Sequence, residues 1–319
     1  NDCDTDCNVC GDVREVKPAG PVLKPELKFI QAGISYQDYI GLNYAMWLSE
    51  VQKYDKVYVK SIQKNYEGDI EETLYGVIML DVLWVVDKPV MCWDMTDEII
   101  ITLYAEKDGI VYQGETIETS VVKSAKQALA NVNNGPAARK ALVDMLNFGA
   151  VVQTQFNHNP TNLPNTDLGE YATAGTAGIP AASGSYVITN ENGLFKLNTP
   201  SLSVQSKVEI QFGFMQDMSA YEVRVTVDGE TTIIPGSEIK LVPGYEAHGI
   251  RALGVAVKAA NMRKEYTIAI YETATDTLVS QVFTASVEAL VAKQINNPEH
   301  KDHDLMVAML RYGDSVAAL

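Results

Sequence analysis

Cysteine is the residue type in this sequence whose spacing most clearly suggests a chemical role, because three of the four cysteines lie within the first ten residues. Cys3, Cys7 and Cys10 offer three thiolate ligands to one Zn²⁺ ion, which takes four, and the first histidine comes only at His158. In an oxidising compartment they would instead form disulfides, one within the cluster and one reaching Cys92. Free thiols and a bridge between two chains are further alternatives. We favour disulfides and assign no metal here.

The same segment spaces its acidic and amide side chains as a calcium-binding loop does. Positions one, three, five, nine and twelve of such a loop would be Asp4, Asp6, Asn8, Asp12 and Glu15. Position six, however, is Val9, where the sharp turn of the loop requires glycine, and no helical pattern flanks the segment. An acidic, solvated tail explains the pattern better.

Histidine and nucleophile patterns point to no reaction. His300 and His303 are spaced to share one helical turn with Asp302 and Asp304, but they follow Pro298, where a helix would begin and acidic side chains would serve its positive end. The nucleophile motif Gly-x-Ser-x-Gly is absent from the sequence. We therefore predict a non-enzymatic protein with no catalytic, cofactor-binding or metal-ligating residues.

Tryptophan offers a different chemistry, the stacking of an aromatic ring on a sugar. Trp47, Trp84 and Trp93 all lie in the first half of the chain, and the second half has none. Burial in a core or an interface is therefore the simpler interpretation. Trp93, next to Cys92, is the tryptophan of most interest.

Length and charge limit the classes of function. A chain of 319 residues suits two domains, and its composition of 46% hydrophobic and 21% charged residues is that of a globular protein. No apolar run reaches the ~18 residues of a membrane-spanning helix. The net charge of −16 repels nucleic acid and anionic lipid. We predict neither nucleic-acid binding nor membrane insertion.

The elements that would position these residues occur twice. The helical segment Leu142–Gly149 returns 164 residues later as Met306–Gly313, with matching methionine, leucine, aromatic and glycine positions. Long-range self-similarity of this kind indicates repeated modules. Strand-like segments upstream repeat at shifts of 168 and 167 residues, namely 35–44 with 203–212 and 95–104 with 262–271.

Each copy closes with two helical patterns, 122–132 and 138–156 in the first copy and 287–295 and the Met306 segment in the second. Gly149 inside a helix costs about 1 kcal/mol relative to alanine. Its return as Gly313 predicts a close approach between helix and sheet.

The expected fold is therefore α+β, with two tandem modules that each consist of an antiparallel, sandwich-like β-sheet with C-terminal helices packed on it. The predicted boundaries are a Cys-rich acidic segment and linker (1–24), module 1 (25–157), a linker (158–185) and module 2 (186–319). A hairpin over residues 186–197, turning at Asn192-Gly193, is expected to open module 2.

These motifs resemble tandem modules of large secreted surface proteins from Gram-positive gut and rumen bacteria. The helix motif continues as Gly149-Ala150-Val151-Val152-Gln153-Thr154-Gln155-Phe156 and then Asn162-Leu163, as those modules do. The N-terminal cluster of cysteines also resembles a short unit found beside them. The second copy departs from the pattern at Asp314 and Ser315. The resemblance covers about residues 25–168 and 186–319 and implies an architecture and an extracellular setting, with no established reaction.

We therefore expect an extracellular, non-enzymatic structural or adhesive surface protein that associates with itself into a filament or array. Cell wall or glycan are the alternative partners, and a carbohydrate-binding module is the alternative function. Residues Pro18–Ile30 could add a strand to the open sheet edge of a neighbour.

Overall fold

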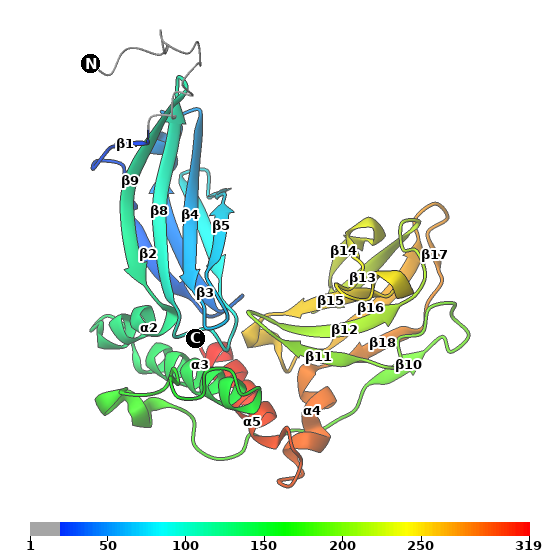
Figure 1. The fold of residues 1–319 in the computed structure, drawn as a ribbon. Coiled ribbons are helices and arrows are strands. Elements are labelled where there is room, and N and C mark those ends of the chain that lie inside the picture. The colour runs from blue at the N-terminus through cyan, green and yellow to red at the C-terminus, as the bar shows by residue number, and fades with distance from the viewer. Residues whose placement is uncertain (1–19) are drawn as a thin grey trace, which may run out of the picture.

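The computed structural model describes residues 20–319 and shows an α+β protein whose two halves repeat one order of elements. Each half is a sandwich of two mostly antiparallel sheets followed by a pair of helices, and the halves meet at these helices (Figure 1). The predicted fold is confirmed. Cys3, Cys7 and Cys10, the calcium-like loop and most of the predicted segment 1–24 lie outside the described residues.

Module 1 is built from a larger and a smaller sheet. The larger sheet has the spatial order β1 (Val22–Leu23), β9 (Ile110–Thr119), β8 (Glu98–Lys107), β4 (Lys56–Lys64) and β5 (Ile70–Leu74). The smaller sheet has the order β2 (Gln31–Ser35), β3 (Gly41–Trp47), β7 (Leu83–Pro89) and β6 (Val77–Met79), with the short helix α1 (Leu48–Val51) after β3. Strand β8 shows the cause of the sandwich, because Ile99, Ile101 and Leu103 alternate along it and are fully buried.

Module 2 repeats this architecture. Its larger sheet has the order β10 (Val187–Thr189), β18 (Val282–Ala285), β16 (Tyr266–Glu272), β13 (Tyr221–Val227) and β14 (Glu230–Pro235), with β17 (Thr277–Leu278) paired to β16. Its smaller sheet has the order β11 (Ser201–Val204), β12 (Val208–Phe214) and β15 (Arg251–Val257). Short 3₁₀ turns are η1 (Gly169–Ala174), η2 (Gly236–Glu238), η3 (Glu246–His248) and η4 (Ala259–Asn261).

The strand orders of the modules correspond in most of each sheet, although β6 and β17 have no counterpart. The series β9-β8-β4-β5 matches β18-β16-β13-β14, and β2-β3-β7 matches β11-β12-β15. The predicted hairpin over 186–197 is wrong, because β10 pairs with β18 and Phe195 only bridges Ser280. Phe195 is instead buried, with its ring centroid 4.8 Å from that of Tyr221, and burying an aromatic ring outweighs a local strand pairing.

The helical pairs begin and end close to the predicted bounds. They are α2 (Val121–Ala130) and α3 (Pro136–Gln155) in module 1, and α4 (Val287–Ile295) and α5 (His303–Ala317) in module 2. Ser120 and Ser286 cap α2 and α4 by accepting hydrogen bonds from the N–H groups of Lys123 and Ala289, each at 3.0 Å. None of the helices within residues 20–319 has the length and apolar character that crossing a bilayer requires.

Candidate functional site at the junction between the modules

The repeated glycines lie where each long helix meets its own module. A Cβ on Gly149 would lie 2.7 Å from the end of the Met95 side chain and 2.9 Å from the carbonyl oxygen of Cys92. A Cβ on Gly313 would lie 2.7 Å from Met262 Sδ and 3.0 Å from the carbonyl oxygen of η4 residue Ala259. The close approach predicted from the sequence therefore exists in both copies, with equivalent neighbours.

The aromatic residues before these glycines meet at the centre of the junction. Helices α3 and α5 pack against each other, and the rings of Phe148 and Tyr312 stack with their centroids 5.7 Å apart and their planes 15° apart. The Tyr312 hydroxyl donates a hydrogen bond to the carbonyl of Tyr36 in module 1. Desolvation raises the pKa of this buried phenol, so it stays a donor.

Backbone hydrogen bonds cross the junction in a reciprocal pattern. The N–H of Cys92 donates to the carbonyl of Gln205 at 3.2 Å, and the N–H of Ala259 donates to the carbonyl of Gln37 at 3.0 Å. Gln37 and Gln205 occupy the same place in the two copies, and so do Cys92 and Ala259. These two contacts between the modules are therefore reciprocal, as they would be about an approximate two-fold axis. A third bond, from Ile40 N–H to Ser206 carbonyl at 2.8 Å, adds to this contact.

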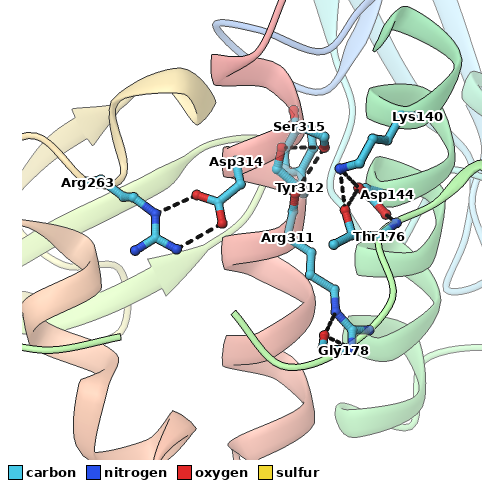
Figure 2. Close-up of polar contacts among 9 residues, drawn as sticks. All are labelled: Lys140, Asp144, Thr176, Gly178, Arg263, Arg311, Tyr312, Asp314 and Ser315. Atoms are coloured by element: carbon cyan, nitrogen blue, oxygen red, sulfur yellow. Dashed lines mark hydrogen bonds and ion pairs between the residues drawn. The ribbon is translucent and has the colours of Figure 1, made fainter. Parts of the chain in front are cut away.

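Residues 158–185, expected to be a surface linker, run along both long helices, and we call this segment the strap. Asp144 on α3 is buried and accepts hydrogen bonds from the backbone N–H of Thr176, at 2.7 Å, and from the Thr176 hydroxyl (Figure 2). Lys140 lies 3.3 Å from Asp144 and also donates to the Thr176 hydroxyl. A buried carboxylate with three donors is well compensated, so Asp144 fixes the strap to α3.

Two arginines hold the other end of the strap. Arg311 on α5 donates to the carbonyl of Gly178, with its Nε at 2.7 Å (Figure 2). Arg263 donates to Ala181 carbonyl at 3.0 Å and makes a two-pronged contact with Asp314, at 2.5 and 2.8 Å. Asp314, which departs from the repeat in the sequence, is therefore the partner of an arginine that copy one lacks. Ser315, the other departure, donates to the carbonyl of Arg311 at 2.9 Å inside the helix.

The tryptophans occupy three different environments. Trp84 is buried in the core, as predicted. Trp93 is half-buried, with its ring 6.1 Å from that of Phe156 at the end of α3 and 6.3 Å from that of His158. Trp47 at the end of β3 remains 51% exposed. Only Trp47 among the three offers a ring face of this size to solvent.

A buried polar cluster lies beside Trp93, where the strap begins. His158 Nε2 is 2.8 Å from Asp94 Oδ1, and Asp97 Oδ2 accepts hydrogen bonds from the amides of Gln63 and Asn65, both at 2.8 Å. Desolvation raises the pKa of both carboxyl groups. These contacts connect the loop before β8 to β4 and to the strap, so we assign the cluster a structural role, holding these three segments together.

The remaining candidates from the sequence do not come together. Cys92 is buried, burial raises the pKa of its thiol, and its Sγ lies 3.7 Å from the carbonyl oxygen of Val204. Its predicted disulfide partners lie outside the described residues. Asp302 is the N-cap residue of α5 and Asp304 lies in its first turn, as predicted. Within residues 20–319, no three His, Cys, Asp or Glu side chains are grouped so that they could hold a metal ion.

Comparison with known proteins adds no family to this description. The sequence matches no protein-family model, and a search of curated proteins gave no significant match.

Proposed function

We propose that this chain is a non-enzymatic, extracellular building block, a structural or adhesive surface component that associates with copies of itself. The observation that carries the proposal is the junction, which joins two sandwiches into one unit. The buried apolar residues of both modules form one continuous cluster that runs through α3 and α5. Interfaces between domains permit relative motion unless they are large and hydrophobic, and this one is built like a core.

A fixed angle between modules is what an assembling subunit requires. Small changes of angle at each subunit would add up along a filament or across an array, so order depends on a rigid repeat. The stacked rings, the reciprocal backbone bonds and the strap all restrain this angle. The junction also leaves both sandwiches projecting away from the helices as two arms (Figure 1).

The test is to image the purified full-length chain by negative stain and to measure its mass by light scattering, with and without reductant. Ordered polymers are expected, and their loss in reductant would implicate Cys3, Cys7 and Cys10 in the joints. Phe148→Ala should produce disordered or fewer polymers because it empties the centre of the junction. Val132→Ala, which changes a residue exposed in the turn between α2 and α3, is the matched control. A chain that stays monomeric in all conditions would contradict the proposal.

Carbohydrate binding is the second candidate, and the half-exposed ring of Trp47 is the observation that favours it. A glycan array probed with the wild-type chain and with Trp47→Ala tests it. A signal that disappears in the variant would support a binding module, and a folded chain without signal would count against one.

A further inference from the structure

A lysine fills the gap between the two sheets of module 1. Lys88 of β7 is buried between the sheets, and its Nζ lies 2.5 Å from Oε2 of Glu72 on β5. Glu72 lies opposite the buried Ser61 of β4, so its side chain shares the inner face of the larger sheet. A lysine suits this position because its aliphatic stem can be buried while its ammonium reaches a partner close to solvent.

The registers of the repeated strands give the counterparts of these three residues in module 2. They are Val255 for Lys88, Thr232 for Glu72 and Val225 for Ser61. Both members of the ion pair are therefore replaced by short side chains, and the hydroxyl is replaced by an apolar group. A valine and a threonine are too short to span the gap between the sheets as the lysine and the glutamate do.

Module 2 has a cavity of about 570 Å³ at this place, between β13 and β14 of the larger sheet and β15 of the smaller one. This volume is within the range of small-molecule sites, about 300–1,000 Å³. Val225, Val255 and Tyr266 line the cavity and are buried. Thr232 and Gly254 also line it and are exposed, so the cavity opens to solvent.

The mouth of the cavity carries one carboxylate without a basic partner. Lys264 pairs with Asp228 at 2.7 Å, and Lys258 pairs with Asp38 of module 1 at 2.9 Å. Glu230 of β14 also lines the cavity, and none of the ion pairs in the described part of the chain includes it. Three carboxylates and two ammonium groups leave one negative charge in excess at the mouth, which favours a cationic ligand.

We propose that this cavity binds a primary alkylammonium group, with the aliphatic chain against Val225 and Val255 and the ammonium at Glu230. The ligand would do in module 2 what the Lys88 side chain does in module 1, so the chain itself contains the template for its ligand. In a protein partner this chemical group is a lysine side chain. An anion would meet the excess negative charge, and a neutral hydrocarbon would leave the carboxylate at the mouth without a partner.

This inference goes beyond the proposed function, because it holds whether or not copies of the chain associate. The experiment titrates n-hexylammonium into the full-length chain, isotope-labelled at the valine methyl groups, and follows it by NMR. The methyl signals of Val225 and Val255 should move and saturate, whereas those of Val132, which is exposed in module 1, should not move. The neutral n-hexanol should bind roughly fivefold more weakly, because it lacks the ion pair.

Two variants separate the charge from the cavity. Glu230→Gln should weaken the binding of n-hexylammonium roughly fivefold and leave the binding of n-hexanol unchanged, because it removes only the ion pair. Glu246→Gln changes an exposed glutamate of module 2 outside the cavity and is the matched control. Val255→Lys combined with Thr232→Glu rebuilds the ion pair of module 1 in module 2, so it should fill the cavity and abolish binding of both ligands.

Valine signals that stay in place at millimolar n-hexylammonium would refute the site. Equal binding to wild type and Glu230→Gln would refute the assignment of an ammonium ligand, and this exposed substitution decides the matter even if the double variant does not fold. Binding retained by a folded double variant would place the ligand elsewhere. Nα-acetyl-lysine methylamide identifies the source of the ligand: binding as tight as that of n-hexylammonium supports a lysine side chain, and no binding would overturn that source.

Discussion

Replacing Gly149 by alanine tests whether the close approach at the junction limits the sequence. An alanine inside a helix would normally gain about 1 kcal/mol over glycine. Here its Cβ would lie 2.7 Å from Met95 Sδ and Cε and 2.9 Å from the Cys92 carbonyl oxygen. The end of the methionine side chain can move aside. The carbonyl cannot easily do so, because the N–H of the same residue bonds to Gln205 in module 2.

The expected net effect is a loss of stability. Forcing a methyl group into a packed region costs about 1–3 kcal/mol, and a backbone contact puts this site near the upper end. Subtracting the gain in helix propensity leaves a net destabilisation of about 1–2 kcal/mol. Gly313→Ala should behave alike, because Met262 Sδ and the Ala259 carbonyl lie at 2.7 and 3.0 Å from its Cβ.

Urea unfolding followed by circular dichroism measures the effect as a shift of the midpoint. Gly213→Ala is the control, because a Cβ there meets no atom within 4 Å, and it should be neutral or stabilise by up to about 1 kcal/mol. A Met95→Ala background should reduce the cost of Gly149→Ala, which a double-mutant cycle would show as coupling. If Gly149→Ala proved more stable than wild type by the full propensity gain, the close approach would not constrain this helix.

Three further predictions concern the polar contacts. Burial raises the pKa of Asp94 and Asp97 above 3.8, so the folded state binds protons at these carboxyl groups more tightly than the unfolded state does. The free energy of unfolding should therefore fall as pH rises through the raised pKa values. Asp97→Asn should flatten this part of the pH dependence, as urea midpoints measured from about pH 4 to about pH 7 would show. Asp314→Asn should lower the free energy of unfolding by about 1 kcal/mol; the effect is small, and smaller still in high salt, because the contact between Asp314 and Arg263 is partly exposed to solvent. An unchanged urea midpoint at low salt would contradict this prediction. The buried thiol of Cys92 should resist iodoacetamide in the folded chain and react in urea, as peptide mass spectrometry of residue 92 would report; rapid native labelling would show the core to be open there.

Much of the fold could be predicted because the same order of strand and helix patterns occurs in both halves of the sequence. A single strand such as β8 is ambiguous, but its repetition in β16 at the same distance from a repeated helix removes the ambiguity. Serine followed by valine begins both α2 and α4, and in both helices the serine is the N-cap. The hairpin over 186–197 failed because local turn signals at Asn192-Gly193 say nothing about which distant strand edge is free, and β18 offered one.

The junction could be predicted only in part. Gly149 and Gly313 indicated a close approach, because a glycine that recurs inside a helix has a packing reason. The stacking of Phe148 on Tyr312 could not be foreseen, since periodicity shows which face of a helix is apolar and not which other helix covers it. The course of the strap along α3 and α5 could not be predicted either. Its small residues suit a surface loop, and the buried Asp144 that holds Thr176 is one acidic residue among 41 acidic residues in the sequence.

The reciprocal bonds between Cys92 and Gln205, and between Ala259 and Gln37, have a consequence for growth. An isologous contact is used up once it forms, because each half satisfies the other and no binding surface of that kind remains. One polypeptide therefore already contains its own closed dimer. Larger assemblies of this chain must therefore be built through surfaces other than this junction.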